Sequence, residues 1–466
     1  MIKNRKLVPI EQAMELLNRR AATYNVVTIS RIKGPLNEAL IRQALDLAQS
    51  RHPRLNSRIV GSLKNLRFET EGKTKIPLRV VKNYRNEQWH DVVLEEMNEK
   101  IDSSNVLLRA VLVQIESEIN TSYLITTIHH AITDALSGIR LHSELLTYCQ
   151  RLAAGERITH VSSLPVLPSV EELLPESMQG LRGDVNGAFW LLRLTLKQLW
   201  HRPKMLNFEN YAPTELRRCG IVHRQIDEKI TQQFIELCRQ EKTTIQGALC
   251  AAMLLVAAKK ITVRETTEVC VSCESYVDLR RRLKPVVSDE HMNLLASSVT
   301  SYHTLRTHTS VSAFHTLKTH TSLWQLARDV SRQVKAGVEN GNIFRSVLIA
   351  KKIVESFVSR PNEVPVTVAL TNVGRVNIPT VYGPFHLEEI SYAPTQAAFP
   401  GVITAAVATF EGKMLLNFVF SEPSISPETM ETLVDSVVSH IVDVCAGSTS
   451  TKLPRLESAR LASSRV

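Results

Sequence analysis

Two neighbouring apolar segments constrain the fold of this chain more than any other feature. Residues 107–115 and 123–128 are rich in aliphatic and β-branched side chains, and the polar stretch 116–122 separates them. Segments of this composition are typical of β-strands, and a short polar connection favours their pairing. The second segment continues directly into His129 and His130. The sequence therefore predicts a pair of strands that ends in two histidines.

Helical patterns surround this strand pair. Residues 136–149 carry apolar side chains at helical spacing, which predicts a helix soon after the histidines. Residues 40–48 show the same spacing and are followed by His52 and Pro53. Because proline disfavours helical backbone in the residue before it, we expect that helix to end there and the chain to continue in extended form. The first half of the chain is thus predicted to mix helices and strands.

The second half repeats this mixture. Thr243 or Thr244 is a suitable N-cap for a helix over residues 245–260. Ser426 followed by Pro427 predicts the start of the last helix. Strands are predicted at residues 268–276 and 366–370, and at 402–410 and 414–420 with a hairpin turn between the last two.

Composition argues against a disordered, fibrous or membrane-spanning chain. The 466 residues are 44% hydrophobic and 22% charged, as in ordinary globular proteins. The longest uncharged apolar run, residues 248–258, is shorter than the roughly 18 residues that a membrane-spanning helix needs. Seven cysteines without a framework spacing, and the lack of a signal-like segment near Met1, favour free thiols in a reducing cytosol. The formal charge of +10 is dispersed and selects no partner by itself.

The length predicts two or three domains, and two of around 200 residues each could bury substantial cores. Residues 162–175 contain three prolines and little periodicity, which is typical of a surface crossover. The predicted organisation is a first lobe at residues 1–175, a crossover with a basic helix at 176–215, a second lobe at 216–446 and a loose tail at 447–466.

The crossover includes an apolar segment, residues 188–204, that has basic but no acidic side chains. Its apolar spacing predicts an amphipathic helix. We expect its apolar face to cover a hydrophobic groove or the junction between the lobes, since most apolar stripes pack internally. Contact with an anionic membrane stays open as the alternative, favoured by Arg193, Lys197, Arg202 and Lys204.

A short tandem repeat lies in the second half. The segment 303–310 recurs twelve residues later as 315–322 with one substitution, so four histidines gather in a short stretch. Imidazole groups are common metal ligands, which makes a metal site conceivable. We favour a lengthened surface loop instead, because the entropy of loop closure grows only slowly with length. The sequence therefore predicts no metal site here.

Ionisable side chains cluster where the second predicted strand ends. His129 and His130 are adjacent, so in a strand they face opposite sides and only one can enter a given cavity. Asp134 lies four residues after His130, and a sharp turn would let its carboxylate brace the loop or orient the imidazole. This pattern favours a histidine general base. A metal site is disfavoured because no further carboxylate or cysteine stands nearby, and a purely structural histidine pair remains the alternative.

The motif His129-His130-xxx-Asp134 resembles the HHxxxD motif of an acyltransferase superfamily. That superfamily includes chloramphenicol acetyltransferase, the plant BAHD acyltransferases and the condensation domains of nonribosomal peptide synthetases. The order of features is similar along nearly the whole chain, including residues 52–55 (His-Pro-Arg-Leu) and 277–280 (Val-Asp-Leu-Arg). The likeness is greatest to condensation domains and to polyketide-associated acyltransferases of the phthiocerol dimycocerosyl transferase type.

The resemblance implies an α/β (α+β) fold of two chloramphenicol-acetyltransferase-like lobes, a pseudo-dimer with a tunnel between them and His130 midway. It implies that His130 is the general base and that His129 supports it. It further implies that Asp134 turns away from the reaction and pairs with Arg280 to hold the loop.

Other positions bear on substrate binding. Gly138 and Asn372 are candidate substrate-binding residues, and Asn372 could offer an amide hydrogen to a developing oxyanion. Local turn chemistry is the alternative for Asn372, which precedes a glycine turn. Ala135 replaces the glycine that commonly follows the motif and adds a methyl group beside the loop. Residues 371–375, a predicted strand and turn, stand where the plant enzymes have Asp-Phe-Gly-Trp, which argues against that branch.

The predicted activity is acyl transfer from a CoA or carrier-protein thioester to an alcohol or an amine. The thioester is a co-substrate, and we expect neither a metal nor a permanently bound cofactor. Amide-forming condensation is one alternative, and a catalytically silent domain that binds a carrier protein or lipid is another. The expected partners are an acyl carrier protein or CoA thioester and a small acceptor, without nucleic acid. We expect a cytoplasmic monomer and leave a peripheral membrane contact open.

Overall fold

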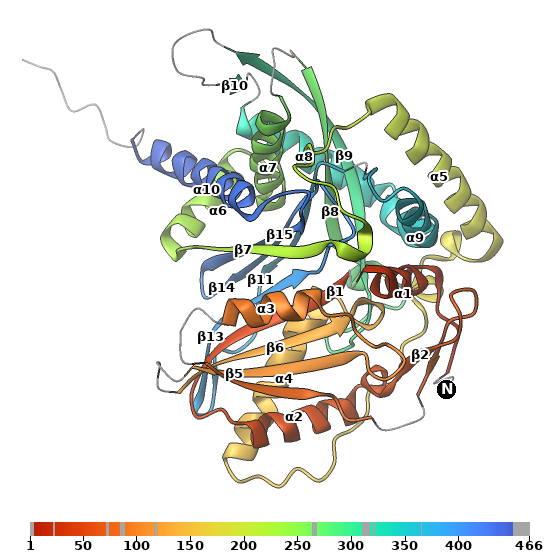
Figure 1. Cartoon of the computed structure of the whole chain (residues 1–466), viewed down its shortest axis with the longest axis vertical. Helices are drawn as coiled ribbons and strands as arrows, with labels where there is room; N and C mark the ends of the chain where they lie inside the picture. Colours follow the sequence, from red (N-terminus) through yellow and green to blue (C-terminus); the bar gives the residue numbers. More distant parts are fainter. Residues whose placement is uncertain are drawn as a thin grey trace, which may run out of the picture.

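The computed structural model describes residues 4–21, 24–70, 74–83, 89–115, 118, 120–262, 268–309, 317–319, 322–364 and 366–450. Its helices and strands form two lobes, each built around one large sheet. In Figure 1 the first lobe lies in the lower half of the view and the second lobe lies above it. The prediction of a mixed α/β fold with two lobes is confirmed.

The sheet of the first lobe takes strands from both halves of the chain. Its order is β12 (Val381–Tyr382), β13 (Phe385–Pro394), β1 (Asn25–Lys33), β6 (Thr121–His129), β5 (Leu108–Ile115) and β4 (Leu78–Asn83). Helix α4 (Ala135–Ala153) packs against β1 and β13 with α2 (Glu38–Arg51) beside it. Helix α3 (Trp89–Asn98) lies on the side that faces the second lobe, and its Asn98 amide bonds the backbone of Cys219 there over 2.7 and 2.9 Å.

The second lobe has a longer sheet and more helices around it. The order of its strands is β10 (Leu317–Thr319), β9 (Ala296–Thr309), β8 (Glu268–Asp278), β11 (Val368–Arg375), β14 (Ile403–Phe410), β15 (Lys413–Glu422) and β7 (Arg218–Ile226). Its helices are α6 (Glu228–Gln240), α7 (Ile245–Ile261), α8 (Leu323–Glu339), α9 (Asn342–Ser359) and α10 (Pro427–Ser450).

Strands β12 and β13 correct the predicted division into lobes. The prediction assigned residues 216–446 to the second lobe as one continuous unit. Strand β13 instead pairs with β1 of the first lobe in antiparallel register, with Val26 opposite Pro394. The physical reason is that β1 would otherwise leave the edge of its sheet unpaired. Residues 381–394 therefore belong to the first lobe by hydrogen bonding and connect the two lobes.

Many predicted elements are confirmed. β5 and β6 form the expected antiparallel pair, with Leu108 opposite Ile128, and the hydroxyl of Thr244 caps α7 by accepting from Gly247 N–H. One expectation was wrong, because residues Pro53–Asn56 form a 3-10 turn before β2 (Arg58–Val60) pairs with β3 (Arg67–Glu69). Proline suits the first position of such a turn.

The predicted tail also needs correction. Helix α10 continues through Gly447 to Ser450, so the chain is still helical where the loose tail was expected to begin. The buried stripe of Val437, Ile441 and Cys445 holds this helix against the second lobe. The rest of the predicted tail, residues 451–466, lies outside the described residues.

The tandem repeat does not begin as a surface loop. Its first copy lies in β9, where His303 is buried and hydrogen-bonds Asp329 and Ser301 over 2.7 and 2.9 Å. The first copy is therefore part of the sheet, which corrects the interpretation as a surface loop. Of the second copy, residues 317–319 form β10 beside β9, while His315 and His320 lie outside the described residues.

The predicted basic helix is present as α5 (Gly180–His201) and begins earlier than expected. One side of it packs against α9, but most of its large apolar side chains face outward, which corrects the expectation that the apolar face is covered. Among the described residues no single helix is both long and apolar enough to cross a membrane. Helices α6 and α7 meet that criterion only as a pair, which is bent by 98°.

Candidate active site

The histidine motif lies where β6 passes into α4. β6 ends at His129, a 3-10 turn follows at His130–Ile132, and Asp134 is the N-cap of α4. The Asp134 carboxylate accepts from Ser137 N–H over 2.9 Å, which satisfies one of the free amides at the helix start. A strand, a tight turn and a capped helix therefore fix the positions of all three motif residues.

His129 faces the buried side of this junction. Its Nδ1 accepts from Ala131 N–H over 3.1 Å, so the proton is on Nε2, which donates to Glu15 over 2.8 Å. Glu15 lies in α1 (Pro9–Ala21), is fully buried, and also accepts from Ser103 and Arg19. Burial alone would raise the pKa of Glu15, but these hydrogen bonds outweigh it and lower that pKa.

His130 faces the opposite side, as expected for neighbours at a strand end. Its Nδ1 lies 2.6 Å from the carbonyl oxygen of Thr133. A carbonyl can only accept, so Nδ1 carries the proton and the lone pair is on Nε2. Burial lowers the pKa of His130, although the Thr133 bond and the charge of Asp134 partly oppose that shift. The ring is therefore neutral near pH 7 and has one nitrogen able to take a proton.

Asp134 and Arg280 form the cross-lobe pair that the resemblance implied. The two guanidinium nitrogens lie 2.7 and 2.9 Å from the two carboxylate oxygens, and both side chains are buried. Ser137 bonds both partners, and the backbone N–H of Leu295 donates to Asp134 over 3.1 Å. Burial alone would raise the pKa of Asp134, but Arg280 outweighs it and holds that pKa below its usual range. The carboxylate thus ties the loop after His130 to Arg280 and Leu295 of the second lobe.

Two cavities meet at His130. One has a volume of about 540 Å³ and is lined by residues that include Asp134, Ala135 and Asn372. The other has a volume of about 330 Å³ and lies between α5, α9 and β9. Both cavities are lined by Tyr24, His130, Tyr276 and Ala296. His130 therefore borders both cavities.

Tyr24, Tyr276 and Glu274 are site residues that the sequence analysis missed. The Tyr24 ring stacks on His130 with centroids 6.0 Å apart, and its hydroxyl lies 2.8 Å from the Tyr276 hydroxyl. Burial raises the pKa of both tyrosines and of Glu274, and the Glu274 charge adds to the shift of each tyrosine. Tyr24 has φ of 62°, a left-handed backbone that is unusual outside glycine. No local motif marks Tyr24, because its partners are hundreds of residues away.

The two candidate substrate-binding residues have different positions. Gly138 lies inside α4 away from both cavities, where a Cβ would come within 2.3 Å of the Thr28 hydroxyl, so its role is close packing on β1 and the prediction is corrected. Asn372 does line the larger cavity, but its side-chain oxygen accepts from Gly374 N–H over 2.8 Å, which is the local turn bond named as the alternative. An oxyanion role for its amide hydrogens stays a prediction. Ala135 also lines this cavity.

No metal centre accompanies the motif among the described residues, which contain no group of three histidine, cysteine or acidic side chains able to hold an ion.

Two family models match this chain. The condensation-domain family model matches residues 11–271, which is more than half of the chain. A second model, the C-terminus of phthiocerol/phthiodiolone dimycocerosyl transferase, matches residues 217–419. Together they cover both lobes and both partners of the Asp134–Arg280 pair.

Individual relatives are distant. A probable alcohol acetyltransferase, FCK4, of Fusarium pseudograminearum is 22% identical over 331 residues, which is 67% of this chain and 65% of that protein. Trichothecene 15-O-acetyltransferase TRI3 from Fusarium sporotrichioides has a similar structure, with a TM-score of 0.73, 12% identity and coverage of 94% and 95%. Polyketide synthase associated protein 5 from Mycobacterium tuberculosis is similar with a TM-score of 0.66, 16% identity and coverage of 95% and 98%. With its shared fold and matching family models, the chain belongs to the condensation-domain family of acyltransferases.

Proposed function

We propose that this protein transfers an acyl group from a thioester to an alcohol, with His130 as the general base. The acceptor O–H gives its proton to Nε2 of His130 while its oxygen attacks the thioester carbonyl carbon. The carbon–sulfur bond then breaks, and the thiolate takes the proton back from the imidazolium. The products are an ester and a free thiol, so the step needs no oxidant and leaves the histidine neutral.

One observation carries this proposal: His130, whose Nδ1 is bonded to Thr133 and whose Nε2 has no hydrogen-bond partner among the described residues, lines both cavities. The bond from Nδ1 to Thr133 fixes the tautomer, and the lowered pKa keeps the ring unprotonated. A donor in one cavity and an acceptor in the other could both reach the imidazole without displacing each other. Holding the reacting groups in this way supplies much of a catalyst's advantage.

The larger cavity suits the phosphate-bearing arm of a thioester donor. Arg281 and Arg375 line it, as do Asp278 and the Arg140–Asp289 pair, and the two arginines would meet the anionic phosphates of CoA or of carrier-bound phosphopantetheine. The smaller cavity has a more apolar wall, with Trp190, Phe357 and Phe399, and would hold the acceptor. The names of FCK4 and TRI3 favour an alcohol over an amine as that acceptor.

The proposal is tested with the purified protein, acetyl-CoA, longer acyl-CoAs and acyl carrier proteins as donors, and matched alcohols and amines as acceptors. The intact masses of acceptor products report which bond forms, and release of free thiol reports the rate. We expect esters to form with the wild-type protein and to be nearly lost with His130→Ala. Thiol release by both proteins at the same rate would contradict the proposal, and amide products alone would change the acceptor class.

A further inference from the structure

Helix α5 carries an apolar face that no part of the described chain covers. Seven large apolar side chains on it are exposed, and Phe189 and Trp200 reach 75% and 86% exposure. We name these residues the α5 outer face: Leu181, Val185, Phe189, Leu192, Leu196, Leu199 and Trp200. At about 100° per residue they fall within an arc of roughly 100° on the helix. A continuous apolar stripe of this kind is rare on a surface exposed only to water.

The opposite side of α5 packs closely against the rest of the protein. Gly183, Gly187 and Trp190 are buried toward the rest of the protein. A Cβ at Gly187 would lie 3.3 Å from Ile349 of α9, and one at Gly183 would lie 2.3 Å from a backbone oxygen. These close approaches fix the rotation of α5 and leave its apolar stripe pointing outward.

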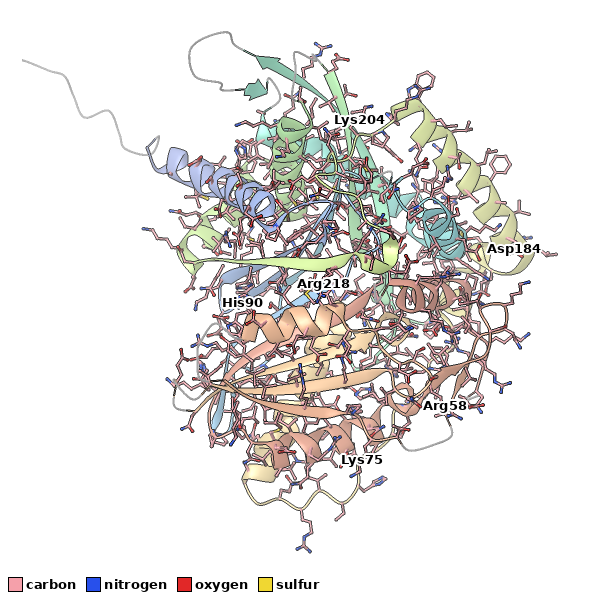
Figure 2. All side chains as sticks on the ribbon, in the orientation of Figure 1. Arg58, Lys75, His90, Asp184, Lys204 and Arg218 are labelled. Carbon is pink, nitrogen blue, oxygen red and sulfur yellow. The ribbon has the colours of Figure 1, made fainter. Side chains whose placement is uncertain are left out.

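Basic side chains border the outer face. Arg182 and Arg193 are exposed next to it, and Arg202 and Lys204 are exposed just beyond the helix. Asp184 is the one acidic residue within α5. Figure 2 labels Asp184 at one end of α5, at the edge of the molecule, and shows the helix side chains projecting away from the lobes. The surface around the stripe is therefore positively charged, which complements anionic phosphate groups.

We propose that the α5 outer face lies on the surface of an anionic lipid bilayer, with the helix in the plane of the headgroups. The 22 residues of α5 form a ridge about 33 Å long, convex and isolated at the edge of the molecule. A convex ridge with a narrow apolar stripe and a basic border matches an interfacial helix. Aromatic side chains at Phe189 and Trp200 suit the boundary between headgroups and acyl chains.

The position of the smaller cavity gives this contact a consequence. Trp190, Leu194 and Lys197 on the inner side of α5 line that cavity, which reaches His130. A protein resting on α5 would hold the cavity beside the lipid phase. An apolar acceptor dissolved in the membrane would then have a short path to the imidazole. The membrane contact itself does not depend on acyl transfer.

The test is co-sedimentation of the full chain with phosphatidylcholine vesicles that contain phosphatidylserine, against vesicles of phosphatidylcholine alone. Wild-type protein should bind the anionic vesicles and release them as salt is added. Phe189→Ser/Leu196→Ser should weaken binding about tenfold or more, because two buried apolar side chains are lost. Arg182→Gln/Arg202→Gln should weaken it about fivefold per charge.

A matched control separates this face from exposed apolar residues in general. Tyr211 and Leu216 are 75% and 71% exposed outside α5, and Tyr211→Ser/Leu216→Ser should bind vesicles like the wild type. Thermal melts should show all variants folded, since each altered side chain is on the surface. Wild-type protein that ignores anionic vesicles at low salt would overturn the proposal. An equal loss of vesicle binding in Tyr211→Ser/Leu216→Ser would overturn it too. If Phe189→Ser/Leu196→Ser changed the protein from dimer to monomer and left vesicle binding unchanged, the face would be a contact between copies and the proposal would also be wrong.

Discussion

The two adjacent histidines at the end of β6 face opposite sides of the strand and have different surroundings. On the closed side His129 is fully buried, accepts from Ala131 N–H and donates to Glu15, which also accepts from Ser103 and Arg19. On the open side His130 shares two cavities with Tyr24 and keeps a free lone pair. A histidine with both nitrogens engaged supports structure, and one with a single nitrogen engaged can do chemistry. The comparison predicts opposite outcomes for changes on the two sides.

The largest expected effect is on turnover when the open side is changed. His130→Ala should lower kcat by about 10²–10⁴, the usual contribution of a general base, and leave the melting temperature nearly unchanged. His129→Ala should instead lower the melting temperature, because it leaves the buried Glu15 carboxylate without its histidine partner. Rates and melts of both purified variants check this. Turnover of His130→Ala within a few-fold of the wild type would remove the base assignment.

The next effect concerns the pair that joins the lobes. Asp134→Ala should lower the free energy of unfolding by roughly 3–5 kcal/mol, because the buried Arg280 charge loses its main partner. Denaturant unfolding of Asp134→Ala and His130→Ala side by side measures the difference. Equal stability of the two variants would contradict the structural role of Asp134.

This pair also sets a pH dependence. The pKa of Asp134 is lower in the folded protein than in the unfolded chain, where it is about 3.9. Its contribution to stability is therefore complete above that pH and is lost as pH falls through the folded value. Acid unfolding of the wild type should show this loss, and Asp134→Ala should lack it.

A smaller effect is expected on the closed side. Glu15→Gln should cost about 1–3 kcal/mol of unfolding free energy, because the amide cannot accept all three hydrogen bonds. We expect kcat to fall only a few-fold, since Glu15 acts through the backbone that carries His130. Glu95→Gln is the matched control, as Glu95 pairs with Arg79 at the surface and should cost no more than about 0.5 kcal/mol. A loss in Glu15→Gln no larger than in the control would refute this role.

The smallest effect is expected far from the motif. Deletion of residues 310–321 removes twelve residues, one period of the repeat, and keeps both buried His303 in β9 and the Ser322 cap of α8. Activity should stay within a few-fold, and the protein should bind no stoichiometric zinc before or after deletion. Joint loss of bound metal and activity would revive the histidine-cluster interpretation.

Local patterns predicted what depends on local chemistry. The pairing of β5 with β6, the Thr244 cap and the helix after Asp134 follow from spacing and capping preferences over a few residues. The Asp134–Arg280 contact spans 146 positions and came from the resemblance, since no local pattern links the two residues.

The features that local sequence patterns did not predict depend on contacts between distant residues. Tyr24 meets Tyr276 over 252 positions, and β13 leaves the second lobe to complete the sheet of the first. Helix α1 was absent from the prediction although Ile10, Met14 and Leu17 have helical spacing, and the burial of its Glu15 depends on the distant partner His129. The periodicity of α5 predicted the helix but could not tell which of its two faces would be covered, because two glycines and a tryptophan make the packed side.

The central claim is that neutral His130 takes the acceptor proton, and the pH dependence of kcat/KM tests it most directly. Burial lowers the pKa of His130, so the ring should lose activity only when pH falls below the ordinary histidine value of about 6.5. The account predicts a plateau through neutral pH and an acid limb below about 6.5. The account would be contradicted if kcat/KM kept rising above pH 6.5 as a single group lost its proton. It would also be contradicted if kcat/KM showed no acid limb.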